Sequence, residues 1–290
     1  MNAQQEALRR CRASVSPAVK NRLRAWLAGP GATLIQQSPD PLGAFCLGGE
    51  AVGKLTPESV RALRSDAGLR SLAAETAPLR FELIAEPTFE ARTSAMRRLT
   101  DRLEALGLNQ RRRNELLDIR SRSGTILAVA ERAAFRRLGM PTAAVRAAAL
   151  TKDGRILMQK RSALKQVGPG RWDNLASGMV AAGEAYPLAM SRELDEEAGL
   201  VIAPDRLSPE PSLSFSSDMP VRYGWMTELS VTFRVVVPDG YEPVNRDGEV
   251  ECFAALTPEE VLPLIEEDRC MPEAAVAVAL ELLGSGIGSC

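Results

Sequence analysis

The chain contains no histidine among its 290 residues. Histidine is the usual base beside a nucleophilic serine or cysteine, and it is a common ligand of zinc. Its absence excludes hydrolases that depend on a histidine base, and it excludes zinc sites with histidine ligands. Hydrolytic chemistry in this chain therefore has to use carboxylates, lysine, tyrosine or a bound metal ion.

Cysteine is scarce and scattered, and no two cysteines form a CxxC pair. The five positions are Cys11, Cys46, Cys252, Cys270 and Cys290. An odd number of widely spaced cysteines favours a reducing compartment over a disulfide framework. The first 14 residues also lack the apolar run of a secretory signal. Together these features predict a cytoplasmic protein.

Long apolar runs and an excess of one charge are missing as well. No stretch approaches the roughly 18 apolar residues that a membrane-spanning helix needs. The 36 basic residues are balanced by 37 acidic ones, for a formal net charge of −1. We therefore expect neither a membrane nor a nucleic acid as a partner. The hydrophobic share of 45% is typical of a globular protein, and the length allows two domains.

The pattern of apolar residues and turn residues predicts a domain boundary near residue 125. Residues 1–125 should form a small α+β domain, with a hairpin over 44–54, a helix from about 87 to 106 and an arginine-rich connection over 109–124. Residues 126–290 should form the second domain. It is expected to contain a helix over 126–138, a hairpin over 143–160 around an Asp-Gly turn, a strand over 229–237 and a helix over 272–283.

The segment 178–200 carries the most informative pattern. Pro187 suits the first turn of a helix, and Gly199 suits the position just after its end. On that helix Glu193, Glu196 and Glu197 fall within a sector of about 100°. Carboxylates crowded in this way repel one another unless a cation neutralises them, and Mg²⁺ prefers carboxylate and phosphate oxygens. These three residues fit a magnesium site for a phosphate-containing substrate, but an isolated E-x-x-E-E cluster is more often a merely solvated acidic face, and the complete pattern of the segment has to decide between the two.

The same run fits the pattern G-x5-E-x7-R-E-U-x-E-E-x-G-U at every position, where U is a bulky aliphatic residue. A chance match in one window of average composition is on the order of one in 10⁹. The segment therefore resembles the Nudix box, and the chain is identified as a member of the Nudix hydrolase superfamily. The resemblance implies an α/β/α sandwich around a mixed sheet. It also implies hydrolysis of a diphosphate linkage in a small molecule with Mg²⁺, for which Mn²⁺ can substitute.

The resemblance further implies roles for individual residues of the box. Glu196 and Glu197 would be the principal metal ligands, and Glu193 would be a further ligand or the base that orients the attacking water. Arg192 would hold Glu193 in place. Gly178 would allow a tight loop and offer its carbonyl oxygen to the metal. Two of these residues, Glu193 and Arg192, are thus expected to take part in catalysis.

Residues outside the strict acidic core are implied as well. Glu184 would brace the loop of the box. One more acid is expected from outside the box to take part in catalysis, and Glu249 is favoured over Glu251 for this role. The candidates for binding the substrate precede the box: they are Lys160, Arg161, Trp172, Asp173 and Asn174. Trp172 suits stacking on a substrate ring and a lid over the core equally well, and the two basic residues also suit an exposed strand end.

Further motifs narrow the resemblance to one branch of the superfamily. The runs at 47–53, 113–116, 159–162, 169–174 and 247–250 are similar to the branch that carries a thiamine-pyrophosphokinase-associated N-terminal domain. This implies thiamine diphosphate or a damaged analogue as the substrate. The run Ala144-Val145-Arg146 departs from that branch, whose members have a Gly-Val-His-like strand there. A hydrolase of ADP-ribose or dinucleotides, a non-catalytic metabolite sensor, and a homodimeric assembly all stay open.

Overall fold

A mixed β-sheet forms the centre of the computed structural model, which describes residues 3–35, 41–64, 66–72, 79–109, 112–165, 167–208, 212–221 and 224–284. The strand order is β11-β12-β7-β8-β13, with β9 paired to β8 and β10 paired to β7. Strands β12 and β7 run parallel, and the other pairs are antiparallel. The strands are β7 (Thr142–Leu150), β8 (Ile156–Arg161), β9 (Trp172–Asn174), β10 (Ser177–Met179), β11 (Leu213–Val221), β12 (Gly224–Val236) and β13 (Val250–Leu256).

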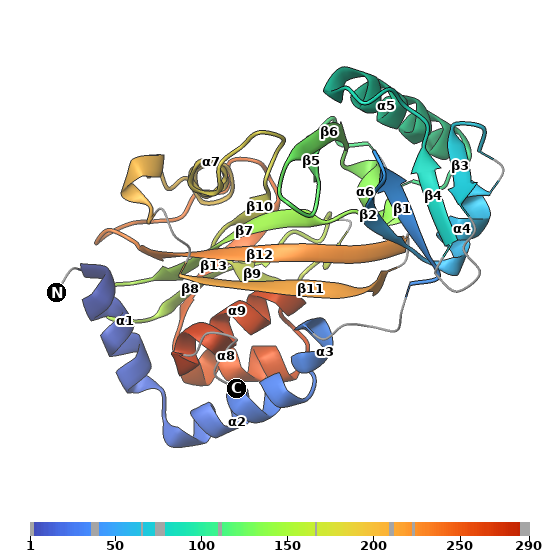
Figure 1. Ribbon diagram of the computed structural model, residues 1–290. Helices are drawn as coiled ribbons and strands as arrows, with labels where there is room; N and C mark the ends of the chain where they lie inside the picture. Colours follow the sequence, from blue (N-terminus) through green and yellow to red (C-terminus); the bar gives the residue numbers. More distant parts are fainter. Residues whose placement is uncertain are drawn as a thin grey trace.

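Helices cover both faces of this sheet, which confirms the expected α/β/α sandwich (Figure 1). On one face lies α7 (Tyr186–Ala198), and Val231 and Phe233 of β12 pack in the same buried cluster as its apolar residues. The opposite face is covered by α1 (Ala3–Ser14), α2 (Pro17–Ala28), α8 (Pro258–Glu266) and α9 (Pro272–Leu283). The short helices α3 (Ala32–Ile35) and η1 (Pro204–Arg206) complete this part of the fold. No helix among the described residues is both long and apolar enough to span a membrane.

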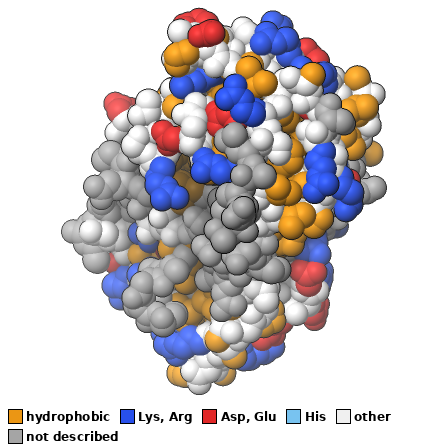
Figure 2. All heavy atoms as spheres, turned by 45° about the vertical axis from the view of Figure 1, so that its right-hand side comes forward, with side chains coloured by type: hydrophobic (Ala, Val, Ile, Leu, Met, Phe, Trp, Pro, Cys, Tyr) orange, Lys and Arg blue, Asp and Glu red, His pale blue; other side chains and the backbone are white. Residues whose placement is uncertain are grey.

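A second, four-stranded sheet with the order β2-β1-β4-β3 lies beside the sandwich (Figure 1). The expected hairpin over 44–54 is confirmed, with Gly48 and Gly49 in its turn. The elements of this region are β1 (Gly43–Leu47), β2 (Glu50–Leu55), α4 (Pro57–Leu63), β3 (Leu69–Leu72), β4 (Leu79–Leu83), α5 (Phe89–Ala105), β5 (Leu116–Arg120), β6 (Ile126–Glu131) and α6 (Ala133–Leu138). On the face shown in Figure 2, basic and acidic side chains are interspersed with hydrophobic ones, in keeping with the balanced charge of the chain.

The helix expected over 126–138 is wrong in its first half. Residues 126–131 form strand β6, which pairs antiparallel with β5, and helix α6 begins only at Ala133. Strand β5 itself lies inside the segment 109–124 that was expected to be a polar connection. A short apolar run suits a strand and a buried helix equally well, and the neighbouring strand decides between them.

The packed cores do not divide at residue 125. Cys11 and Val19, from the first two helices, lie in the same buried cluster as α8 and α9 of the sandwich. Conversely, Leu127, Phe135 and Met140 lie in the cluster built around β1, β4 and α5. The start of the chain therefore completes the Nudix-like sandwich, and the smaller α+β unit is inserted after it. The pattern of an amphipathic helix predicts that its apolar face is buried, but it does not predict which element covers that face.

Candidate active site

Helix α7 carries Glu193, Glu196 and Glu197 and packs against the sheet. Pro187 lies in its first turn, and Gly199 ends it with a φ of 66°, a left-handed conformation that glycine adopts without strain. The helix packs its apolar stripe on the core, and this turns two of the three glutamates inward. Glu197 is 3% exposed and Glu193 is 8% exposed, whereas the side chain of Glu196 is 51% exposed. The three carboxylates that the pattern placed in one sector are therefore not equivalent.

Glu197 is the most deeply buried of them. Its Oε2 accepts hydrogen bonds from the Ser177 N–H and from Gln159 Nε2, each at 2.8 Å. Burial raises the pKa of Glu197 to about 8, and the negative charge of Glu193 adds to this effect. A carboxylate that is buried at such a cost is poised to bind a cation, because a positive charge would restore its ordinary ionised state.

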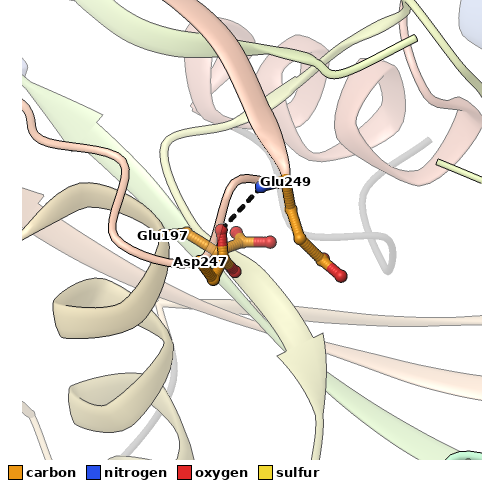
Figure 3. Close-up of side chains that lie close together, drawn as sticks. All are labelled: Glu197, Asp247 and Glu249. Atoms are coloured by element: carbon orange, nitrogen blue, oxygen red, sulfur yellow. Dashed lines mark hydrogen bonds between the residues drawn. The ribbon is translucent and has the colours of Figure 1, made fainter. Parts of the chain in front are cut away.

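Two further carboxylates meet Glu197 from a distant part of the chain. Oxygen atoms of Glu197, Asp247 and Glu249 all lie within 4.8 Å of one another. Figure 3 shows Asp247 and Glu249 on the loop that leads into β13, beside Glu197 on α7. The loop is held in shape by the Glu249 N–H, which donates to Asp247 Oδ1 at 2.8 Å. Three oxygen donors in this arrangement fit a hard divalent cation.

The residues of this cluster overlap only in part with those expected from the sequence. Glu249 was expected as the additional acid, and the structure brings it to Glu197. Asp247 was not among the expected site residues, although the Asp-Gly-Glu turn offered a signal, since such a turn can place both acids on one side of a loop. Glu251 instead pairs with Lys160, with its Oε1 2.7 Å from Lys160 Nζ. Glu196 is placed against Arg192, 3.3 Å from Nη1, and is not part of the cluster.

Arg192 organises the other half of the site. Its Nη1 donates to Glu193 Oε1 at 2.6 Å. Its Nε and Nη2 donate to the two oxygens of Glu184 at 3.0 and 3.1 Å. Burial would raise the pKa of Glu184, but Arg192 and the Ala181 N–H hold it below its ordinary value. These contacts give Arg192 and Glu184 the bracing positions that the resemblance implied.

Gly178 lies directly beneath the Glu193 carboxylate. A Cβ added to Gly178 would lie 1.9 Å from Glu193 Oε1, so a side chain there and the present position of that carboxylate exclude each other. Burial raises the pKa of Glu193, and the adjacent Arg192 opposes this rise. The carboxylate is thus held in one place and has a greater tendency to accept a proton than an exposed glutamate.

The smaller α+β unit touches the loop of the box. The Ala182 N–H donates to the Leu116 carbonyl oxygen at 2.8 Å, and the Gly183 N–H is 3.3 Å from the carboxylate oxygens of Asp118. The negative charge of Glu115 also contributes to the raised pKa of Glu193. Strand β5 therefore supports the loop that precedes α7. Apart from the family-like run at 113–116, no pattern in the sequence predicted this contact.

Of the residues expected to bind substrate, Lys160, Arg161 and Asp173 already have ion-pair partners, whereas Asn174 Oδ1 is buried without a hydrogen-bond partner. Arg161 Nη1 lies 2.9 Å from Asp173 Oδ2, and both Asp173 and Asn174 are buried. Trp172 packs against the core under α8 and α9. The backbone N–H of Trp172 donates to the Arg269 carbonyl at 2.8 Å, and the backbone carbonyl of Trp172 accepts from the Met271 N–H at 2.7 Å. Of the two roles open to Trp172, its position agrees with the lid over the core.

The buried side chain of Arg146 lies next to Asp173. Arg146 donates to Ser230 Oγ at 3.2 Å and to Glu228 Oε1 at 3.5 Å, and its Nη1 is 3.6 Å from Asp173 Oδ1. Glu273, at the start of α9, is buried in the same region, and burial raises its pKa. Arg146 therefore serves as the shared counter-ion of several buried acids under the sheet.

Comparison with known proteins identifies the sandwich. Residues 140–274 match the family model of the NUDIX domain, and this part of the chain is therefore a Nudix domain. Nudix hydrolase 24, chloroplastic, of Arabidopsis thaliana is 26% identical over 199 residues, which cover 67% of this chain and 54% of that protein. The uncharacterized Nudix hydrolase PA4841 of Pseudomonas aeruginosa is 49% identical over 47 residues, which cover 16% of this chain and 28% of that protein. The chain spans about half or less of the length of the curated relatives it matches.

Solved structures include similar chains. The crystal structure of DR0079 from Deinococcus radiodurans is 25% identical, with a TM-score of 0.43; the match covers 56% of this chain and 98% of that one. The NUDIX domain of NrtR from Shewanella oneidensis, solved with ADP ribose, is 15% identical, with a TM-score of 0.34; that match covers 48% of this chain and 84% of the other.

Proposed function

We propose that this chain is a metal-dependent pyrophosphohydrolase that cuts a diphosphate linkage in a small metabolite. One observation carries the proposal: within the Nudix domain, the buried Glu197 meets Asp247 and Glu249, while Arg192 holds Glu193 beside them. The reaction adds water across the phosphorus–oxygen–phosphorus bridge. It yields two monophosphates, or a monophosphate and orthophosphate.

Magnesium is the proposed ion, with manganese as a substitute. Glu197, Asp247 and Glu249 would hold it, and Glu193, Glu196 and the Gly178 carbonyl are the further candidates from the box. Such an ion, when bound, lowers the pKa of water and neutralises phosphate charge. The three clustered carboxylates fit it, since they are oxygen donors within reach of a single centre.

The chain's own residues would handle the proton and the geometry. Glu193 would accept the proton of the attacking water, because burial raises its pKa. Arg192 would keep the Glu193 carboxylate in place through the 2.6 Å hydrogen bond. Lys160 and Arg161, at the end of β8, would offer positive charge to the phosphates after leaving their present partners, Glu251 and Asp173.

Thiamine diphosphate or a damaged analogue is the proposed substrate. The support is the motif resemblance at 113–116, 159–162 and 169–174 to the branch with a thiamine-pyrophosphokinase-associated N-terminal domain. ADP-ribose or a dinucleotide is the second candidate, because the box pattern by itself does not distinguish among diphosphate-linked metabolites. A cytoplasmic location and a homodimeric assembly also stay predictions.

The test is a hydrolysis screen of the purified full chain, read by product mass, with and without Mg²⁺. The panel contains thiamine diphosphate, its oxidised forms, ADP-ribose and dinucleotides. We expect turnover only with the ion, and a fall of about 10²–10⁴-fold for Glu197→Gln, the usual scale for losing a group essential to proton transfer or charge stabilisation. Glu259→Gln, in the exposed first turn of α8, is the matched control and should keep full activity. Binding of a panel member without turnover in Mg²⁺ or Mn²⁺ would identify a metabolite sensor instead.

A further inference from the structure

A lysine side chain lies against the acidic cluster. Lys165 lies in the loop between β8 and β9, and its side chain is only 17% exposed. Its ammonium group forms an ion pair with Glu249 and lies 3.9 Å from Glu197 Oε1. The negative charge of Asp247 acts on it as well. Lys165 is therefore in contact with two of the three clustered carboxylates and within the field of the third.

The neighbouring cations are engaged elsewhere. Arg161 pairs with Asp173, and Arg192 pairs with Glu184 and Glu193. Within the described part of the chain, Lys165 is the basic side chain whose printed ion pairs join Glu197 to Glu249. Without it, the buried Glu197 of α7 and the two acids of the loop before β13 would face one another with no basic partner, which is costly.

An ammonium group and a divalent ion cannot share these oxygens. Mg²⁺ binds carboxylate oxygens at about 2.0–2.1 Å. An ammonium nitrogen that kept its contacts with the same carboxylates would lie only a few ångströms from the ion, and the two positive charges would repel strongly at that distance. One cation therefore has to leave when the other binds.

We propose that Lys165 is the resident counter-ion of the metal-free site, and that a divalent cation binds by displacing its ammonium group from Glu197 and Glu249. This inference rests on the proposed function, because it requires that the cluster binds a metal. Two properties follow. The metal-free chain is stabilised by Lys165, and the affinity for the metal is lower than the carboxylates alone would provide.

The first experiment compares metal binding by two variants of the full chain. Lys165→Met keeps much of the apolar stem and removes the charge. Lys152→Met is the matched control, because Lys152 also forms an ion pair, with Asp239, but at the surface. The concentration of free Mn²⁺ is measured by electron paramagnetic resonance during a titration of metal-free protein. We expect Lys165→Met to bind Mn²⁺ about tenfold more tightly than the wild type, and Lys152→Met to bind as the wild type does.

The melting temperature supplies a second reading of the same variants. Metal-free Lys165→Met should melt below the wild type, and Mn²⁺ should raise its melting temperature by more than it raises that of the wild type. Equal Mn²⁺ affinity in the wild type and Lys165→Met, or weaker binding by the variant, would overturn the displacement and leave the proposed function intact. If Mn²⁺ binds to neither protein, both proposals fail.

Labelling of the wild-type chain tests the displacement even if the variant does not fold. Lysine amines are acetylated briefly with and without Mg²⁺, and the extent at each lysine is read by mass spectrometry. We expect Mg²⁺ to increase labelling at Lys165 several-fold and to leave Lys152 unchanged, because the released amine is no longer held by carboxylates. Unchanged labelling at Lys165 under saturating Mg²⁺ would overturn the proposal.

Discussion

The close approach of Gly178 to Glu193 allows a test whose size follows from the structure. In Gly178→Ala, the new Cβ would lie 1.9 Å from Glu193 Oε1, whereas a carbon and an oxygen in ordinary contact are about 3.3 Å apart. The carboxylate therefore has to move by more than about 1 Å. Alanine can adopt the extended backbone of this position, since Gly178 lies in strand β10, paired with Val145 of β7. The clash with the Glu193 side chain is therefore the effect of the substitution.

The displacement should affect catalysis more than stability. A shift of about 1 Å in a positioned group costs on the order of 10²-fold in rate. Overpacking a filled site costs about 1–3 kcal/mol of unfolding free energy. We therefore expect kcat/KM of Gly178→Ala to fall about 10²-fold, while the variant still unfolds cooperatively at a reduced denaturant midpoint.

A second substitution provides the control. Glu193→Asp shortens the side chain by one methylene and withdraws the carboxylate from the space above Gly178. Adding Gly178→Ala to Glu193→Asp should therefore cost less stability than adding it to the wild type. Stopped assays of product release and urea unfolding measure the two quantities. Full activity and unchanged stability in Gly178→Ala would show that the Glu193 carboxylate does not occupy this position.

Two further predictions concern the core beneath the site. Trp172→Ala should lower the unfolding free energy by up to about 3 kcal/mol, because Trp172 packs on the core; a raised KM with unchanged stability, measured by denaturation and steady-state kinetics, would instead favour stacking on the substrate. Glu273→Gln should stabilise the chain more at pH 8 than at pH 5. Burial raises the pKa of Glu273, so its contribution to wild-type stability is present below the ordinary pKa of glutamate and is lost as the pH rises through the raised value. Melting temperatures of variant and wild type across this range check the sign, and an equal difference at both pH values would contradict it.

Much of the local structure could be predicted because short-range preferences decide it. Pro187 and Gly199 bound helix α7 as expected, since one suits a first turn and the other a left-handed end. The Asp-Gly turn at Gly154 joins β7 to β8 with a φ of 92°. The resemblance to the Nudix box implied a contact between Arg192 and Glu193, and in the structure Arg192 Nη1 donates to Glu193 Oε1.

The helix of the box, its acidic residues and the class of chemistry they favour could thus be predicted from local sequence, because they depend on neighbours within a few residues. The burial of Glu197 and the exposure of Glu196 depend on the fold, since the position of the sheet sets which side of α7 is covered. The fold also brings Asp247 and Lys165 to Glu197. Contacts between such distant segments depend on how the loops return across the sheet, and no local pattern encodes that path.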